Sequence, residues 1–426
     1  MWLSHWRRGL RVSAAVAMCL LVSASPLATA GDPVRPLDAA PSGEVPVVAE
    51  YSIRVDAIPE ALTETPGDAA RGRRVALDGE LGNCSICHVL PDSAIPADAF
   101  GNLGPSLVGV GRRLDAGQLR LRIVDASRLN PDTVMPPYHR IAGLTRVQPA
   151  HRGRPILSAQ QVEDLVAWLR ESDRRSQAAP VMASGTAGES GNISRSRSGY
   201  RYLGPELRAL QDDTFANPGM LWLERGQSLW REPAGQAGRS CADCHRDPDQ
   251  QMTGVAARYP GHDADLDRVI TLEQRINRCR VRHQGAKALE WESDELLALT
   301  LLVTHQSRGM PLSPELDPRA VASLKRGEAL FNQRLGQLNL ACRHCHAERA
   351  GLRLRGEIIS QGQINGFPVY RLLWDTLASS QRMFAWCNEA VRAEPHAPGS
   401  QAYADLALFL AWRGRGLPVE APAVRR

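Results

Sequence analysis

Three pentapeptides with the pattern C-x-x-C-H, at residues 84–88, 241–245 and 342–346, carry most of the chemistry available to this sequence. Two thiols at this spacing can add across the vinyl groups of a haem, and the histidine that follows offers an imidazole to the iron. A single C-x-x-C pair also serves zinc and redox sites. Three copies, each ending in histidine, favour three covalently bound haem c groups over zinc or a disulfide.

The predicted attachment residues are Cys84, Cys87, Cys241, Cys244, Cys342 and Cys345, and the predicted iron-binding histidines are His88, His245 and His346.

The opposite face of the first iron needs a second ligand, and Met135 is the candidate. It lies 47 residues after His88, and the two prolines that follow it would set an extended loop able to present the thioether. His/Met ligation raises the reduction potential, which suits an electron relay. A buried core methionine is the alternative interpretation, and His139 and His151 are alternative ligands.

Two further cysteines are candidate ligands for the other two irons. Cys279 follows His245 by 34 residues, and Cys387 follows His346 by 41. One spare cysteine per motif at similar offsets favours thiolate ligation, and the arginines around Cys279 would favour its ionised form. Thiolate ligands would lower both potentials. A disulfide between these cysteines is the alternative, and Met310 competes for the middle iron.

The elements that must position these residues also repeat. An amphipathic helix pattern with an Arg-Gly pair precedes each motif, at residues 71–72, 225–226 and 326–327, and a second helix pattern follows at residues 162–169, 295–304 and 403–412. This order predicts a mainly α-helical fold of three cytochrome c-type domains. In each domain we expect a glycine to permit close approach of the two helices.

The 426-residue chain is long enough for two to four compact domains, and 43% hydrophobic with 23% charged residues is a globular composition. A net charge of +5, without clustered basic stripes, gives little support for nucleic-acid binding. Residues 1–30 read as a cleaved secretory signal ending near Ala30, which removes Cys19 and leaves eight cysteines. No later stretch is long and apolar enough to span a membrane, so the sequence predicts a soluble exported protein.

The predicted boundaries follow from composition. Residues 31–64 form a loose arm, residues 65–175 the first haem domain, and residues 176–199 a flexible linker rich in Ser, Gly and Ala. Residues 200–316 and 317–426 form two fused haem domains.

Several short segments resemble the SoxAX cytochromes of periplasmic sulfur oxidation. The segment at residues 102–107 and the Met135 loop are similar to the monohaem SoxX subunit. The segments at residues 209–213 and 217–219, and those at 387–388, 391–395 and 414–418, are similar to the start and the end of dihaem SoxA. The resemblance covers about residues 65–175 and 199–426, with SoxX and SoxA joined in one chain.

The resemblance implies a periplasmic L-cysteine S-thiosulfotransferase. Cys387 matches the family's active-site cysteine, which ligates the last haem and can carry a persulfide. The implied reaction joins thiosulfate to a cysteine of the carrier SoxYZ, giving a cysteine S-thiosulfonate and two electrons. Those electrons would leave the third haem, pass the Met135-ligated haem and reach a soluble cytochrome c. The middle haem, with Cys279, is not expected to carry the main flow.

One position departs from the family pattern. The family's active-site arginine stands four residues before the cysteine, where this chain has Met383. Arg382 is the nearest substitute, rotated by about 100° on a helix, and Arg392 is a further candidate for the pocket or for a haem propionate. A tetrathionate-forming thiosulfate dehydrogenase and a non-enzymatic multihaem electron carrier remain alternative functions, with a dihaem peroxidase as a weaker one.

Overall fold

The computed structural model describes residues 48–92, 94–175 and 196–426. The expected signal segment with Ala30 and Cys19, residues 31–47 of the expected arm and residues 176–195 of the expected linker lie outside this part of the chain. None of the helices in the described ranges has the length and apolar character needed to cross a membrane.

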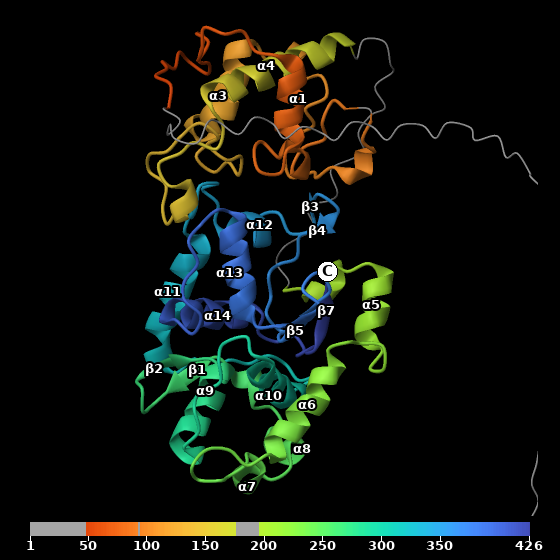
Figure 1. Ribbon diagram of the computed structural model, residues 1–426, viewed down its shortest axis with the longest axis vertical. Helices are drawn as coiled ribbons and strands as arrows, with labels where there is room; N and C mark the ends of the chain where they lie inside the picture. Colours follow the sequence, from red (N-terminus) through yellow and green to blue (C-terminus); the bar gives the residue numbers. More distant parts are fainter. Residues whose placement is uncertain (1–47, 93, 176–195) are drawn as a thin grey trace, which may run out of the picture. The chain divides into compact units, whose positions relative to one another are not determined.

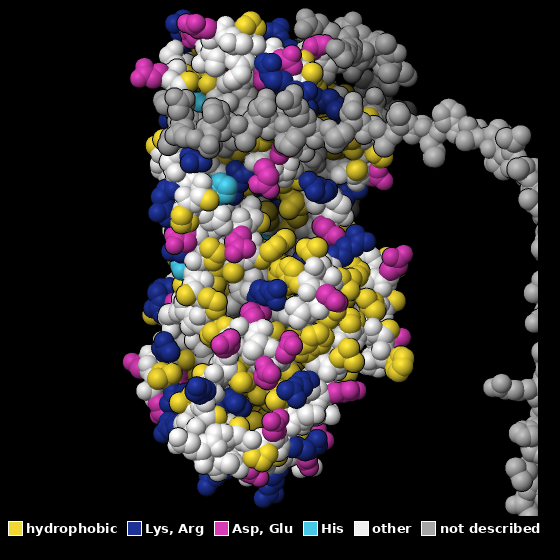
Figure 2. All heavy atoms as spheres, viewed as in Figure 1, with side chains coloured by type: hydrophobic (Ala, Val, Ile, Leu, Met, Phe, Trp, Pro, Cys, Tyr) yellow, Lys and Arg dark blue, Asp and Glu magenta, His cyan; other side chains and the backbone are white. Residues whose placement is uncertain are grey.

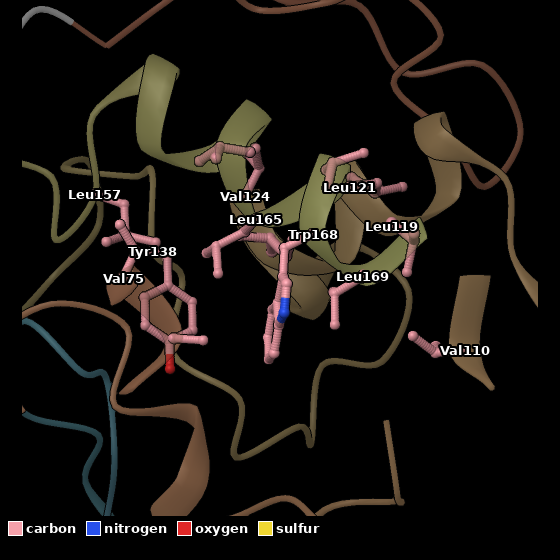
Figure 3. Packing of buried hydrophobic residues seen from close by; sticks show 14 of the residues in the cluster. Val75, Val110, Leu119, Leu121, Val124, Tyr138, Leu157, Leu165, Trp168 and Leu169 are labelled. Carbon is pink, nitrogen blue, oxygen red and sulfur yellow. The ribbon is translucent and has the colours of Figure 1, made fainter. Parts of the chain in front are cut away.

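The first group of helices surrounds the first C-x-x-C-H motif. It consists of α1 (Ala69–Leu77), α2 (Val110–Arg113), α3 (Ala116–Asp125) and α4 (Ala159–Arg175). Leu165, Trp168 and Leu169 on α4 turn toward a core that Leu121 completes from α3 (Figure 3). Tyr138 lies at the edge of this core and donates a hydrogen bond from its hydroxyl to the backbone oxygen of Gly82 at 2.8 Å. The tyrosine therefore ties the core to the chain just before the haem motif.

Residues 48–64 pack closely against this group, whereas the sequence analysis assigned them to a loose arm. Ile58 is completely buried, and its backbone nitrogen donates to the oxygen of Gly117. Arg120 on α3 donates to the oxygen of Ile58 at 2.6 Å and forms a buried ion pair with Glu163 on α4. The packing of this segment could not be predicted from apolar periodicity, because hydrogen bonds to its backbone hold it in place and it has no amphipathic face.

The second group contains the second motif. Its elements are α5 (Pro205–Asp212), α6 (Met220–Arg231), α7 (Ala242–His245), α8 (Pro248–Gln251), β1 (Gly261–Asp263), β2 (Arg268–Ile270), α9 (Leu272–Cys279) and α10 (Asp294–His305). β1 and β2 form an antiparallel pair, and a five-residue π-helical turn, Arg280–Gln284, continues from α9.

The third group contains the third motif and the largest sheet within residues 48–92, 94–175 and 196–426. Its elements are α11 (Val321–Asn332), α12 (Cys342–His346), β3 (Arg353–Leu354), β4 (Glu357–Ile358), β5 (Val369–Arg371), β6 (Thr376–Ala378), α13 (Ser380–Ala390), α14 (Gln401–Arg413) and β7 (Ala423–Arg425). The strand order is β6-β5-β7, antiparallel between β5 and β6 and parallel between β5 and β7. Figure 1 shows β5 and β7 next to each other.

The second and third groups share one apolar core. Tyr370 and Leu377, from β5 and β6, pack in the same cluster as Leu302 of α10. Residue 198, which the sequence analysis placed in the linker, belongs to this body too, because the Ser198 hydroxyl donates to the Glu420 carboxylate at 2.6 Å. The expected division near residue 316 therefore separates two sequence repeats, but the two regions share one hydrophobic core.

A glycine lies at each predicted helix crossing. A β-carbon added to Gly72 on α1 would lie 2.0 Å from the backbone oxygen of Asp164 on α4, and one added to Gly327 on α11 would lie 2.1 Å from that of Asp405 on α14. The third pair, α6 and α10, meets at Gly226, with a corresponding distance of 2.5 Å to the Ala298 oxygen. The expected role of the three Arg-Gly pairs in close helix packing is confirmed.

Basic and acidic side chains are interspersed on the face that Figure 2 shows. This distribution agrees with the small net charge of the sequence.

Candidate functional site

The first motif is held in a position that leaves one histidine nitrogen available. Cys84 begins a short 3-10 turn, Cys84–Ile86, and the His88 ring nitrogen Nδ1 lies 2.7 Å from the backbone oxygen of Pro105. A β-carbon on Gly104 would lie 2.2 Å from Cε1 of His88, so glycine is required beside the ring. Donation from Nδ1 to a carbonyl fixes the ring and directs Nε2 toward a metal.

The third motif repeats this arrangement on α12. Nδ1 of His346 lies 2.9 Å from the backbone oxygen of Ser360, and a β-carbon on Gly362 would lie 2.9 Å from Cγ of the ring. Gly362 also has a φ of +68°, a left-handed conformation that favours glycine. In both motifs, therefore, the two thiols, the oriented imidazole and the space kept open by glycine fit a covalently bound haem c.

The second motif is more open. His245 ends α7 with an exposed side chain, and its ring centroid lies 5.9 Å from that of Trp230. Trp230 donates from its indole nitrogen to the backbone oxygen of Arg246 at 2.7 Å, which fixes the tryptophan beside the motif. The residue types fit haem attachment, and the exposed ring of His245 lies near Trp230.

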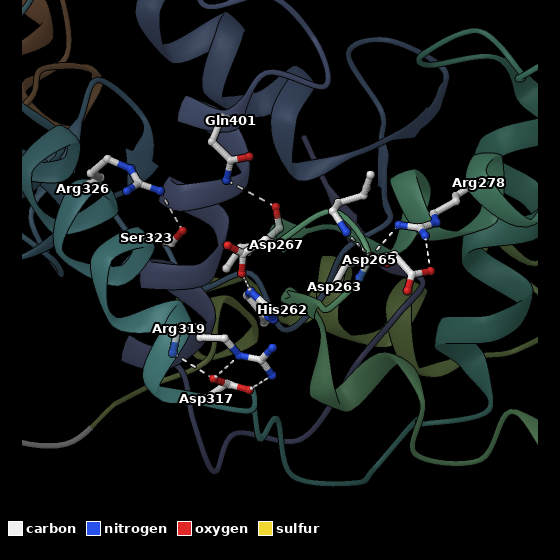
Figure 4. Close-up of polar contacts among 12 residues, drawn as sticks. His262, Asp263, Asp265, Asp267, Arg278, Asp317, Arg319, Ser323, Arg326 and Gln401 are labelled. Carbon is white, nitrogen blue, oxygen red and sulfur yellow. Dashed lines mark hydrogen bonds and ion pairs between the residues drawn. The ribbon is translucent and has the colours of Figure 1, made fainter.

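Cys279 lies at the end of α9, beside the second motif. Burial raises the pKa of its thiol, and the neighbouring charges of Arg275 and Arg278 partly offset this rise. Arg278 also binds the carboxylates of Asp263 and Asp265, each at 2.5 Å (Figure 4). The expected electrostatic support for a thiolate is present, but burial has the larger effect on the pKa of Cys279.

Cys387 lies on α13, beside the third motif. The pKa of its thiol is raised to about 12, mainly by burial and also by the charges of Cys342 and Cys345. Cys279 is influenced in the same way by Cys244 in its own motif. All eight described cysteines are free, so the alternative disulfide between Cys279 and Cys387 is absent. Each spare cysteine therefore accompanies one haem-attachment motif.

A cation that the sequence analysis missed acts on Cys387. The charge of Arg371, at the end of β5, lowers the pKa of the Cys387 thiol against the effect of burial. The Arg371 guanidinium carbon lies 5.1 Å from the ring centroid of Trp374 and 5.5 Å from that of Trp386. Arg371 lies 16 residues before Cys387 and belongs to a strand. It was missed because the sequence analysis looked for cations at helical spacing from the cysteine.

Arg382 and Arg392, the two arginines singled out near Cys387, have other contacts. The guanidinium of Arg382 stacks over Trp374 at 4.4 Å. Arg392 donates to the side-chain oxygen of Gln337 at 2.8 Å and to the backbone oxygen of Glu80 at 2.5 Å. Arg392 therefore joins the third group to the first.

The first and third motifs are neighbours. Burial raises the pKa of Cys87 to about 12, and the charge of Cys345 contributes to that rise. The β3–β4 hairpin lies between the two motifs, where Arg353 donates from its backbone nitrogen to the Asn102 side chain at 2.6 Å. Arg355 donates similarly to the backbone oxygen of Ile86 at 3.0 Å. The redox centres expected in these motifs would therefore be close together.

The remaining ligand candidates differ in their surroundings. Met135 is partly buried and packs against the same core as Cys84. His139 is completely buried, with Nδ1 2.7 Å from the Leu157 oxygen and Nε2 accepting from the Ala49 backbone at 3.0 Å. Both nitrogens of His139 are thus used by the backbone, which removes it as an alternative to Met135. His151 lines a separate cavity of about 140 Å³, and Met310 is 37% exposed and lies beside Gly254.

Comparison with known proteins agrees with this geometry. Over 248 residues the chain is 39% identical to the L-cysteine S-thiosulfotransferase subunit SoxA of Pseudaminobacter salicylatoxidans, which covers 58% of this chain and 87% of the relative. The chain belongs to the SoxA family. A second SoxA subunit, from Rhodovulum sulfidophilum, is 38% identical over 54% of this chain and 80% of its own length.

Further matches support the same SoxA assignment. A family profile described as "SoxA/TsdA, cytochrome c domain" matches residues 225–312, and a cytochrome c domain implies covalently bound haem c. A solved structure, the crystal structure of SoxXA from P. pantotrophus, matches with a TM-score of 0.53 and 35% identity, covering 54% of this chain and 87% of the other. The resemblance to SoxAX-type cytochromes is confirmed.

Proposed function

We propose that this SoxA-family protein joins thiosulfate to a cysteine of the carrier SoxYZ, with Cys387 as the catalytic residue. The observation that carries the proposal is that Cys387, on α13, lies near enough to the thiols of the third C-x-x-C-H motif and to the cation Arg371 for their charges to act on it. A cysteine in such a place can contact a sulfur substrate while a neighbouring redox group accepts electrons. The names of its relatives, L-cysteine S-thiosulfotransferase subunits, describe the same activity.

The reaction forms one sulfur–sulfur bond and releases two electrons. The carrier thiol loses its proton, and its sulfur joins the outer sulfur of thiosulfate to give a cysteine S-thiosulfonate. Two electrons leave for oxidised soluble cytochrome c, which is the oxidant that balances the step. Haem c, when bound, supplies the one-electron acceptor chemistry that a two-electron sulfur oxidation requires.

The chain's own residues orient and shield the reacting sulfur atoms. Cys387, alone or as a persulfide, meets the sulfur of the substrate at a partly buried position on α13. Arg382 acts as a positioning residue, because it stacks on Trp374, which in turn contacts Arg371. Asn388, the next residue on α13, donates to the Tyr403 hydroxyl at 3.1 Å and fixes this end of the helix.

The wider proposal is a SoxX-like region fused to a SoxA-like region, with one haem c in each of three cytochrome domains. His88, His245 and His346 would bind the irons on one side, and Met135, Cys279 and Cys387 on the other. The electrostatic effect of Cys345 on Cys87, and the backbone bond from Arg355 beside the third motif to Ile86 in the first, support a short electron path from the third motif to the first. The export signal predicted at residues 1–30 supports a periplasmic location.

The deciding experiment incubates the purified protein with thiosulfate, oxidised cytochrome c and SoxYZ, and then weighs the carrier by mass spectrometry. We expect the carrier to gain the mass of one S₂O₃ group while the cytochrome is reduced. An unmodified carrier, with tetrathionate in solution, would favour the alternative thiosulfate dehydrogenase. If the carrier is not modified and no tetrathionate forms, the result would favour a non-enzymatic electron carrier.

A further inference from the structure

Arg371 is a half-buried cation without an anionic partner. Within the described part of the chain, its side chain forms no hydrogen bond or ion pair, and its Nε is buried without an acceptor. Two acidic groups act on it, the Cys387 thiol and the carboxylate of Glu357. Glu357 is exposed and forms an ion pair with Arg426 at 3.4 Å. Removing a charge from water without a partner is costly. An anion bound beside Arg371 would offset that cost.

Two indole rings hold the guanidinium at the cysteine. Trp386 is the residue before Cys387, and its ring lies at 72° to that of Trp374, with the centroids 6.2 Å apart. Both rings contact Arg371, so the surfaces around its guanidinium are largely apolar. The guanidinium N–H groups are then the polar part left to bind an anion. A planar fork of donors fits the oxygens of a sulfonate group.

The backbone of Arg371 is held by strand pairing and by a turn. Arg371 ends β5, which lies between β6 and β7, and its register partners are Thr376 and Arg425. Trp374 donates from its backbone nitrogen to the Arg371 oxygen at 3.0 Å, which closes the turn into β6. Arg425 has its own partner, the side-chain oxygen of Gln211 at 2.6 Å. Of these two neighbouring arginines, only Arg371 is left to bind an added anion.

We propose that Arg371 binds the sulfonate end of thiosulfate and directs its outer sulfur toward Cys387. The inference rests on the proposed function and assigns to a strand residue the positive charge that Met383 cannot supply from α13. Arg382 contacts the same indole, with its guanidinium carbon 4.4 Å from the ring centroid of Trp374, and so helps to hold the ring against which Arg371 packs.

The test compares R371Q and R371K with the wild-type full chain in the assay with SoxYZ and oxidised cytochrome c. We expect R371Q to raise the KM for thiosulfate about 10- to 100-fold, since a charge-assisted bond to the substrate is lost. The KM for the carrier should not change. R371K keeps the charge but loses the fork, so its KM should lie between the other two.

Arg208 offers a matched control. Its guanidinium carbon lies 5.4 Å from the ring centroid of Tyr200, and its Nε is likewise buried without an acceptor, but it lies on α5. R208Q should leave both KM values unchanged. Haem content, optical spectra and reduction potentials of every variant are measured in parallel, and these should match the wild type.

Four outcomes would overturn the inference. If the wild-type protein modifies the carrier and R371Q has the wild-type KM for thiosulfate, the anion site is refuted and the proposed function is not. A changed reduction potential with an unchanged KM would assign Arg371 to a haem propionate instead. If R371Q fails to accumulate with bound haem, a wild-type KM in R371K would refute the site. Failure of the wild-type protein to modify the carrier would refute the proposed function itself, and this inference with it.

Discussion

Arg392, five residues after Cys387, donates a hydrogen bond to the backbone oxygen of Glu80, four residues before Cys84. The segment around Arg392 is also bound to the first group through its backbone, because Gln148 donates to the Arg392 oxygen at 3.1 Å. Val147 and Ala393 form a β-bridge beside this contact. The helix that carries Cys387 therefore ends in a segment fixed to the first motif's region.

Replacement of Arg392 by alanine should loosen this contact. Loss of the hydrogen bonds to Glu80 and Gln337 removes about 1–3 kcal/mol. Hydrogen exchange should accelerate in residues 78–83, as measured by mass spectrometry, with haem content unchanged. The control is Arg152→Ala, which removes an exposed ion pair to Glu394 near the same contact and should have little effect. Equal exchange in Arg392→Ala and the wild type would contradict the prediction.

Replacement of Cys387 by alanine should abolish thiosulfate-dependent reduction of cytochrome c. The loss should be about 1000-fold or more, because the reacting sulfur itself is removed. Rates are measured at saturating thiosulfate, and haem content shows whether all three attachment motifs remain loaded. Glu389→Ala changes an exposed residue of the same helix and should retain the wild-type rate. Turnover by Cys387→Ala would exclude the catalytic role.

Thiolate ligation should be visible by electron paramagnetic resonance. Two haems of three should give low-spin thiolate signals, and Cys279→Ala should remove one set while leaving the other. The change follows from the position of Cys279 beside Cys244. Spectra of the His/Met type alone would contradict both cysteine assignments. A signal unchanged in Cys279→Ala but altered in Met310→Ala would assign the middle haem to Met310.

Replacement of Gly327 by alanine should destabilise the third helix crossing. The new β-carbon would lie 2.1 Å from the Asp405 oxygen, which would force α11 and α14 apart. We expect the free energy of unfolding to fall by about 3 kcal/mol, at the upper end for overpacked cores, as measured by denaturant titration. Glu328→Ala, at the exposed neighbouring position, is the control and should change stability by less than about 0.5 kcal/mol.

The buried pair Arg120–Glu163 gives a test of the segment at residues 48–64. Arg120→Met leaves the Glu163 carboxylate uncompensated in a site where both side chains are less than 8% exposed. The free energy of unfolding should fall by about 3–5 kcal/mol. Adding Glu163→Leu should recover most of the loss, and Arg122→Ala, which removes an exposed contact to Asp56, is the control. A double variant no more stable than the single one would contradict the electrostatic explanation.

The sequence predicted the parts of the site that depend on local spacing. The three motifs, the Arg-Gly pairs and the helices that cross at Gly72, Gly226 and Gly327 follow from short patterns, because haem attachment and close helix packing impose fixed local geometry. Cys387 was found by counting thiols, and the SoxA resemblance by short segments that the comparisons support.

Other features depend on contacts between distant segments and could not be predicted. Arg371 reaches Cys387 from a strand within a hairpin, where no helical period connects the two residues. His139 was an alternative ligand for the first iron, but backbone groups of residues 49 and 157 occupy both of its ring nitrogens. Ile58 likewise carries no periodic pattern, and its burial depends on an arginine 62 residues later.

The central position of β5 in its sheet has a consequence for substrate recognition. A strand paired on both edges, with β6 on one and β7 on the other, loses its conformational freedom when the protein folds. Arg371 is thus ordered before any anion binds. The loss of conformational entropy that fixes the cation occurs on folding and does not weaken anion binding. Recognition at Cys387 is preorganised by the sheet, so affinity for the anion would depend on the fold as a whole rather than on a loop that closes over it.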